Sequence, residues 1–136
     1  MLEYVIEDMA VMNDFELHNL CSFYTGLDDY KLPDSEILES GKFRQLDKLL
    51  DEFKETGDRV LIFSQFKIML DIIQEYLNLR KRQFVRLDGS TNVADRQALI
   101  DRYNKDKDIF IFLLTTKAGN FTNSTLRLGG KQKLTC

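Results

Sequence analysis

The sequence predicts an α/β domain built on a parallel β-sheet that is flanked by helices. Three short apolar runs carry this prediction, namely Val60–Phe63, Phe84–Leu87 and Ile109–Leu114. The first and the third are continuous and partly β-branched, as expected of strands covered on both faces. A stretch with helical period separates each run from the next, so the order is β-α-β-α-β. This order is typical of parallel strands joined by right-handed crossovers.

An acidic segment precedes the predicted sheet. Residues 1–40 carry ten acids and one base, a net charge of -9, whereas residues 41–136 carry a net charge of +6. Helical spacing of apolar residues predicts one helix over 6–24. The alternative is a break at Asn13-Asp14, with Asp14 as the cap of a second helix. A loop should follow up to Asp34, because this stretch contains the only proline.

Three further helices are expected around the strands. Ser40 is predicted to cap the first, which should end at Gly57 as a C′ glycine. The second should begin at Phe66, with that ring on its apolar stripe, and end in Arg80-Lys-Arg82. We interpret this triplet as a solvated helix end rather than a nucleic-acid patch. The third should begin near Asn92.

Length, cysteine content and hydropathy narrow the class of protein. A chain of 136 residues suits one domain. Cys21 and Cys136 do not make a disulfide framework, and we expect both to stay reduced in the cytosol or nucleus. No secretory pattern opens the chain and no run reaches membrane-spanning length, so no membrane partner is expected. His18, the only histidine, lacks Cys or carboxylate neighbours at ligand spacing, so we predict no metal site. The acidic residues are not paired in a catalytic arrangement, so we predict no catalytic residue.

The polar candidates follow the predicted strands. The three strand ends read Ser64-Gln65, Asp88-Gly-Ser-Thr91 and Thr115-Thr-Lys-Ala-Gly119. Ligands of open parallel sheets bind beyond these carboxyl ends. Gly89 allows close approach of a ligand, and Ser90 and Thr91 offer hydroxyls at a helix N-terminus, which suits a phosphate oxygen. The alternative for the second loop is a plain capped turn, and for the third a plain strand end.

Four motifs, in this order, resemble the second motor lobe of SWI/SNF-type chromatin-remodelling ATPases of helicase superfamily two. Ser40-Gly-Lys-Phe-Arg-Gln-Leu46 resembles the start of that lobe, and Arg59-Val-Leu-Ile-Phe-Ser-Gln-Phe66 resembles motif IV. Arg86-Leu-Asp-Gly-Ser-Thr91 resembles the DNA-contacting motif that follows. Phe112-Leu-Leu-Thr-Thr-Lys-Ala-Gly119 resembles the front of motif V. Residues 7–18 are similar to the inter-lobe region of one subfamily, the DEAD/H-box-containing SWI/SNF-related actin-dependent regulators of chromatin.

The resemblance implies a partial RecA-like lobe, the helicase C-terminal domain, over 40–119. Residues 1–39 would then be an acidic helical inter-lobe segment and linker, and 120–136 a divergent tail without ordered structure. Since a RecA-like lobe continues its sheet beyond motif V, we expect the third strand to have an exposed or poorly covered edge, depending on its place in the sheet. Ile109–Leu114 has no charge and no proline, so this edge would favour self-association.

Residue roles follow from the same resemblance. The nucleic-acid-binding set would be Ser64, Gln65, Gly89, Ser90, Thr91, Thr115 and Thr116. Lys117, Ala118 and Gly119 would couple the DNA side to the ATP side. The full-length parent would use ATP and Mg, whereas the fragment alone would bind neither. Its partners would be duplex DNA or the nucleosome and the missing first motor lobe, and its location the nucleus.

The chain departs from the family after Gly119. The family continues motif V as Ala-Gly-Gly-Leu-Gly-Ile-Asn, but this chain reads Ala118-Gly-Asn-Phe-Thr-Asn123. Motif VI and the first lobe are absent from the sequence. We therefore expect a fragment of an ATP-dependent chromatin remodeller that is inactive alone. The alternatives are a non-catalytic DNA- or protein-binding module and a gene-model artefact.

Overall fold

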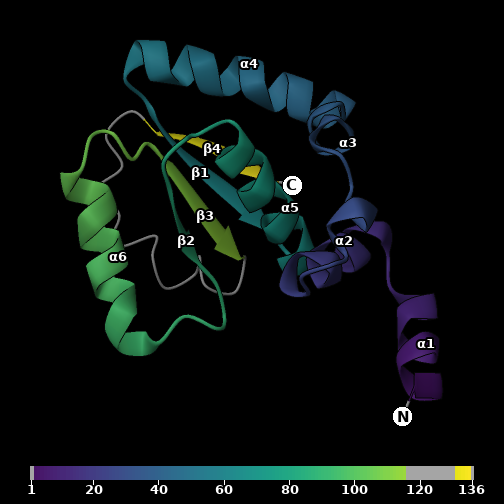
Figure 1. Ribbon diagram of the computed structural model, residues 1–136. Coiled ribbons are helices and arrows are strands. Elements are labelled where there is room, and N and C mark those ends of the chain that lie inside the picture. The colour runs from purple at the N-terminus through teal and green to yellow at the C-terminus, as the bar shows by residue number, and fades with distance from the viewer. Residues whose placement is uncertain (1, 116–130, 136) are drawn as a thin grey trace. The chain divides into compact units, whose positions relative to one another are not determined.

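A computed structural model describes residues 2–115 and 131–135 of the chain. The chain divides into two compact units, Met1–Ser40 and Gly41–Cys136. Figure 1 shows the helices and strands of both units, and each unit is considered by itself.

The first unit is made of short helices. They are α1 (Leu2–Val11), α2 (Asp14–Phe23), the single-turn η1 (Asp28–Tyr30) and α3 (Asp34–Leu38). The expectation of one helix over 6–24 is wrong, and the alternative of a break is confirmed. The cap, however, is Asn13 rather than Asp14. The Asn13 side chain accepts the Glu16 N–H and the Glu16 carboxylate accepts the Asn13 N–H, each at 2.9 Å. This reciprocal capping box starts a new helix.

His18 holds α2 to the loop that follows it. Its ring is buried, and Nδ1 accepts the backbone N–H of Leu32 at 3.0 Å. The ring also stacks on Phe15, with centroids 5.8 Å apart. These contacts give the only histidine of the sequence a structural role in this unit.

The second unit contains a parallel sheet. Its strands are β1 (Arg59–Ser64), β2 (Phe84–Leu87), β3 (Ile111–Thr115) and β4 (Lys131–Thr135), in the order β2-β3-β1-β4. All three strand pairs are parallel. The prediction of three parallel strands with helical crossovers is confirmed. Figure 1 shows the strands running side by side with helices around them.

Two expectations about the sheet are corrected. Residues 131–135 pair with β1 as a strand, although the sequence suggested no ordered structure over 120–136. The part of that tail up to residue 130 lies outside the described residues. In addition, β3 is paired on both sides, with β1 and with β2. The expectation that β3 has an exposed edge is therefore wrong, and with it the argument for self-association through Ile109–Leu114.

Helices cover both faces of the sheet. They are α4 (Gly41–Thr56), α5 (Lys67–Leu79) and α6 (Val93–Lys105). Alternate strand residues point to opposite faces. Phe63 and Leu114 cluster with Tyr103 of α6. Arg86 of β2, which pairs with Leu113, contacts side chains of α5. Thus α6 covers one face and α5 the other.

The core is centred on β1 and β3. Ile62, Phe112 and Leu113 have no exposed surface, and Phe63 is 4% exposed. The Phe112 ring meets the Tyr103 ring edge-on at 4.9 Å. The Tyr103 hydroxyl lies within hydrogen-bond distance of the carbonyl of Val60, at 3.4 Å, and of Phe110, at 3.3 Å. The predicted burial of these strand residues is confirmed.

The side chain of Arg59, the first residue of β1, caps the C-terminal end of helix α6. Its guanidinium lies 5.0 Å from the centre of the Tyr103 ring. It donates to the backbone carbonyl of Tyr103, and to those of Asn104 at 3.4 Å and Asp106 at 3.3 Å. A cation at this position satisfies carbonyls that have no partner within the helix and complements the helix dipole.

Two helices of this unit end in a left-handed residue. Gly57 follows α4 with a φ of 74°, as the sequence predicted for a C′ glycine. The Gly57 N–H bonds the carbonyl of Lys54, and the Asp58 N–H bonds that of Phe53. Lys81 takes the same place after α5 with a φ of 53°, although it is not glycine. Both ends have the hydrogen bonds of a Schellman motif.

The basic triplet after α5 is only partly solvated. Arg80 pairs with Asp47 of α4 at 2.6 Å. Arg82 is 14% exposed and pairs with Asp47 at 3.2 Å and with Asp51 at 2.8 Å. The interpretation of the triplet as a solvated helix end is thus corrected, because two of its three cations join α5 to α4. Lys81, the third cation, is exposed.

We expect Phe112→Ala to lower the free energy of unfolding by about 3–5 kcal/mol, because it opens a cavity between β1, β3 and Tyr103. Urea unfolding followed by circular dichroism measures this loss. Phe66→Ala is the matched control, since that ring is 67% exposed, and should change stability by less than about 0.5 kcal/mol. A loss below about 1 kcal/mol for Phe112→Ala would contradict the central position of β3.

Candidate functional site

The predicted strand ends meet at one edge of the sheet. Ser64 and Thr115 are paired as the last residues of β1 and β3. Leu87, the last residue of β2, pairs with Leu114, so the loop that begins at Asp88 leaves from the same edge. The remaining residues of the motif V segment, Thr116, Lys117, Ala118 and Gly119, lie outside the described residues.

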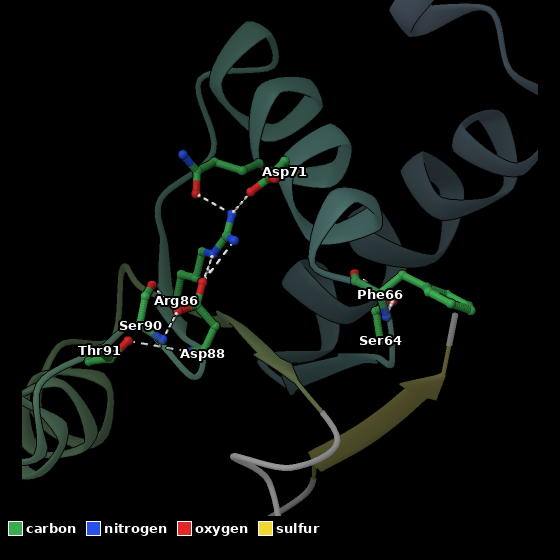
Figure 2. A network of polar contacts seen from close by, with 8 residues as sticks. Ser64, Phe66, Asp71, Arg86, Asp88, Ser90 and Thr91 are labelled. Carbon is green, nitrogen blue, oxygen red and sulfur yellow. Dashed lines mark hydrogen bonds and ion pairs between the residues drawn. The ribbon is translucent and has the colours of Figure 1, made fainter. Parts of the chain in front are cut away.

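Ser64 has an internal role at this edge. Its side chain is fully buried. Its hydroxyl accepts the Phe66 N–H and donates to the Phe66 carbonyl, both at 3.2 Å. Figure 2 shows this closed contact at the start of α5. Ser64 therefore fixes the turn into α5, and its hydroxyl faces the chain rather than a ligand.

The two residues after Ser64 project outward. Gln65 is exposed. Phe66 is the residue that precedes α5, and its ring is exposed rather than part of the apolar stripe as predicted. The helix begins one residue later than the apolar spacing suggested, so the first aromatic of the pattern falls outside the buried face. Of this pair, Gln65 has the polar side chain that a ligand at the edge can reach.

The loop after β2 folds around the carboxylate of Asp88. This carboxylate is buried and accepts the backbone N–H of Ser90 at 2.8 Å as well as the Ser90 hydroxyl. The Asp88 N–H in turn donates to the Thr91 hydroxyl oxygen at 3.1 Å, and the Thr91 N–H donates to the Asp88 carbonyl at 3.1 Å. Four hydrogen bonds thus fix a four-residue turn (Figure 2).

Arg86 anchors this turn to α5. Its Nε and Nη2 lie 2.9 and 2.8 Å from Oδ2 of Asp88. Its Nη1 lies 2.6 Å from Oδ1 of Asp71 and donates to Oε1 of Gln74 at 3.1 Å. Figure 2 shows the guanidinium between the helix and the loop. Arg86 is a strand residue whose charge is satisfied on both sides.

Sequence reasoning missed Arg86 and Asp71. The available signal was a single cation inside the apolar run Phe84-Val-Arg-Leu and an acid on a helix whose neighbours are apolar. A charge placed on a face that should be buried requires a partner of opposite charge. Their separation of fifteen residues in the sequence gave no hint that the two are paired.

The environment of Asp88 favours its ionised form. Burial alone would raise the pKa of the carboxyl group. The hydrogen bonds from the Ser90 hydroxyl and N–H, together with the charge and hydrogen bond of Arg86, outweigh burial and lower the pKa of Asp88 below its ordinary value of 3.8. The turn is therefore built on a carboxylate, not on a carboxylic acid, at neutral pH.

The outer surface of the loop is open. Gly89 and Ser90 are exposed and Thr91 is half-buried. A Cβ atom at Gly89 would meet nothing within 4 Å, so neighbouring atoms leave this surface free. Arg96 of α6 donates its Nε to the Thr91 carbonyl at 3.2 Å, which brings a second cation beside the loop.

A shallow depression of about 490 Å³ continues from the loop along α6. It is lined by Ser90, Thr91, Asn92, Asp95, Ala98, Leu99 and Arg102. The hydroxyl groups of the exposed Ser90 and the half-buried Thr91, the open glycine and the neighbouring arginines suit a phosphate-bearing ligand better than an apolar one.

A protein-family model matches the sequence of the second unit. The model of the helicase conserved C-terminal domain matches residues 41–121, which is more than half of the chain. The chain belongs to the helicase C-terminal domain family. The match begins at the residue where the second compact unit begins.

Curated relatives of this helicase C-terminal domain are SWI/SNF-related proteins. The chain is 56% identical over 117 residues to the SWI/SNF-related matrix-associated actin-dependent regulator of chromatin subfamily A containing DEAD/H box 1 of Xenopus tropicalis. It is 51% identical over 119 residues to the ATP-dependent helicase fft2 of Schizosaccharomyces pombe. These alignments cover 86% and 88% of the chain but 12% and 9% of the relatives. The chain thus spans about a tenth of the relatives' length.

Solved structures agree with the fold. The crystal structure of the C-terminal part of the Fun30 ATPase domain matches with a TM-score of 0.81 and 50% identity, over 88% of this chain and 39% of that one. The C-terminal domain of the Sulfolobus solfataricus SWI2/SNF2 ATPase matches with a TM-score of 0.52 and 22% identity, over 58% and 35% of the two chains. The second likeness concerns the fold alone. The predicted RecA-like lobe is confirmed.

We expect the helicase C-terminal domain to lose stability in acid through Asp88. Because the folded-state pKa of Asp88 is lowered, its contribution is complete above pH 3.8 and is lost as the pH falls below that value. Urea midpoints at about pH 5 and about pH 3 should therefore differ more for the wild type than for Asp88→Asn.

Asp101→Asn, on the exposed surface of α6, is the control for this measurement and should keep the wild-type acid response. An Asp88→Asn variant with the same acid response as the wild type would show that the loop does not depend on the ionised carboxylate.

Proposed function

We propose that this chain forms part of the second motor lobe of an ATP-dependent chromatin remodeller and contacts the DNA backbone through the edge that carries Gly89, Ser90 and Thr91. The observation that supports this most is the anchored turn after β2. Asp88 bonds the hydroxyls of Ser90 and Thr91, and Arg86 anchors Asp88, at the carboxyl edge of a parallel sheet. The similarity to remodellers supports the substrate class.

Backbone contact fits the chemistry of this edge. Hydroxyl groups and backbone N–H groups bind phosphate oxygens and fix the register of a protein on a duplex, but they do not read bases. Residues 41–136 carry a net charge of +6, which favours a polyanion. We include Gln65, Thr115 and Thr116 in the same contact surface. Ser64 contributes indirectly, because it shapes the turn that displays Gln65.

Lys117, Ala118 and Gly119 are proposed to couple the DNA side of the lobe to its ATP side. ATP and Mg would be bound by the full-length parent, with the first motor lobe as the partner. Asp88 does not suit a metal ligand, because its carboxylate oxygens are engaged by Arg86 and Ser90. Among the described residues, no group of three His, Cys, Asp or Glu side chains could hold a metal ion. We therefore assign no reaction step to these residues.

The proposed setting is the nucleus, where duplex DNA or the nucleosome would be the partner. None of the helices in the described part of the chain is long and apolar enough to cross a membrane. The acidic first unit opposes DNA binding by repulsion, because residues 1–40 carry a net charge of -9.

We expect the chain to bind duplex DNA weakly, without sequence preference and with a steep loss of affinity as salt rises. Fluorescence anisotropy with two labelled duplexes of different sequence, over a series of salt concentrations, measures all three properties. Deletion of residues 1–39 should tighten binding, because it removes acidic charge. A sequence preference at constant salt, or unchanged affinity after the deletion, would contradict this assignment.

We expect no ATP hydrolysis by the chain alone, with or without DNA. Phosphoryl transfer needs a phosphate cradle, a metal site and positive charge on the transferring group, and in the family these come from both lobes. Phosphate release measured with and without duplex DNA tests this. The control is the longer Fun30-type ATPase domain. DNA-stimulated turnover by the isolated chain would disprove the proposal that it is inactive alone.

A further inference from the structure

The two hydroxyl groups of the loop are not equivalent. The Ser90 hydroxyl donates its proton to the Asp88 carboxylate. The Thr91 hydroxyl oxygen instead accepts the Asp88 N–H at 3.1 Å, which leaves its proton available. In the part of the chain that the structure describes, no acceptor receives this proton. A phosphate oxygen is an acceptor, so it can pair with the Thr91 hydroxyl but not with the occupied Ser90 hydroxyl.

This difference depends on the position of the Asp88 carboxylate. Its Oδ1 takes the Ser90 groups, while its Oδ2 faces Arg86. The Asp88 side chain is 7% exposed and the Arg86 side chain 15% exposed. A buried carboxylate without its cation would be strongly destabilised. Arg86 therefore determines whether Asp88 can hold the Ser90 proton.

Arg86 is in turn fixed from α5. The Asp71 carboxylate and the Gln74 side-chain oxygen both contact its Nη1. In the described sheet β2 pairs with β3 only, so its end lacks support from a second strand. The contact with α5 supplies this support, because it ties the end of β2 to a helix that covers the sheet. Figure 2 shows Asp71, Arg86 and Asp88 in one continuous series.

We propose that Asp71 and Arg86 are positioning residues which act through Asp88 to make Thr91, and not Ser90, the hydroxyl donor to a phosphate oxygen. This inference rests on the proposed contact of the loop with the DNA backbone. It assigns a role to two side chains that do not themselves reach the ligand, and it distinguishes two neighbouring hydroxyls that the sequence treats alike.

Loop variants measure the difference between the hydroxyls. Thr91→Val should weaken binding to a random-sequence duplex about tenfold, because it removes a hydrogen bond to a charged group. Thr91→Ser should restore most of the affinity. Ser90→Ala keeps the backbone N–H of Ser90 and should lose much less affinity than Thr91→Val, because the Ser90 hydroxyl already donates to Asp88. Since a hydroxyl displaces no counterion, the dependence of log affinity on log salt should keep its wild-type slope in all three variants. Equal losses for Ser90→Ala and Thr91→Val would overturn the distinction.

Variants of Arg86 and Asp71 test the relay, by which we mean the contacts that run from Asp71 through Arg86 to Asp88. Arg86→Gln should weaken binding in the same direction as Thr91→Val does, because the turn that positions the Thr91 hydroxyl on the Asp88 N–H loses its anchor. The two losses should be less than additive in the double variant. If Arg86 contacted a phosphate directly, its replacement would also lower the salt slope by about 0.9. The charge-matched variant, Arg86→Gln with Asp71→Asn, should keep the wild-type slope and lose the same affinity. A lowered slope in this variant, or additive losses with Thr91→Val, would overturn the positioning role.

Two readouts separate this inference from the proposed function and from general unfolding. Asp71→Asn keeps the Arg86–Asp88 pair and provides a milder variant, which should lose affinity in the same direction. Hydrogen exchange at the Ser90 amide reports the turn without DNA, and it should accelerate in Arg86→Gln while the amides of β1 stay protected. Faster exchange at Ser90 with unchanged binding by Thr91→Val would disprove DNA contact at the loop but keep the relay. Weaker binding by Thr91→Val with wild-type binding and exchange in Arg86→Gln would disprove the relay.

Discussion

The parallel pairing of β1 with β3 is the constraint on which the rest of this lobe depends. Five residues of each strand are in register, from Val60 with Ile111 to Ser64 with Thr115. Because the strands run in the same direction, every loop that follows a strand starts from the same edge. This direction places the loops at one edge, and the contacts of the loop residues then fix their geometry. The central position of β1 and β3 also explains why their side chains are among the most deeply buried in the lobe.

The second constraint is electrostatic and concerns the end of β2. A guanidinium on the α5 face of a sheet must be paired, since an isolated charge there would lose its hydration. Two carboxylates, from α5 and from the loop, surround Arg86. Such an arrangement adds little to stability, because the cost of removing charges from water offsets their attraction. The ion pairs instead fix the position of the Asp88 carboxylate, around which the turn after β2 is built.

Much of the fold was accessible from the sequence, for a physical reason. Apolar runs such as Val60–Phe63 must be buried, so they reveal strands and their order without knowledge of their partners. The strand β4 was missed because Lys131-Gln-Lys-Leu-Thr has no apolar run. It pairs through backbone hydrogen bonds, which leave no mark on side-chain pattern. The central place of β3 was missed because sequence order does not determine spatial order.

The candidate site was predictable in location but not in detail. Its loops follow from strand ends, whereas the roles of its side chains depend on distances between segments far apart in the chain. Ser64 illustrates this. From the sequence, a hydroxyl at a strand end is a candidate for ligand binding, yet in the structure it forms hydrogen bonds with the Phe66 backbone. The Asn13 cap shows the same effect locally, since both Asn13 and Asp14 can cap a helix and only the reciprocal bond with Glu16 decides between them.

Helix α6 is attached at both ends by arginines, and this gives it a mechanical character. At its start, Arg96 holds the carbonyl of Thr91 in the loop. At its end, Arg59 holds the last carbonyls from the first residue of β1. The helix therefore behaves as a strut that spans the sheet from its carboxyl edge to its amino edge. The arginine contacts at the two ends of α6 thus join the loop after β2 to the start of the central strand β1 through one helix.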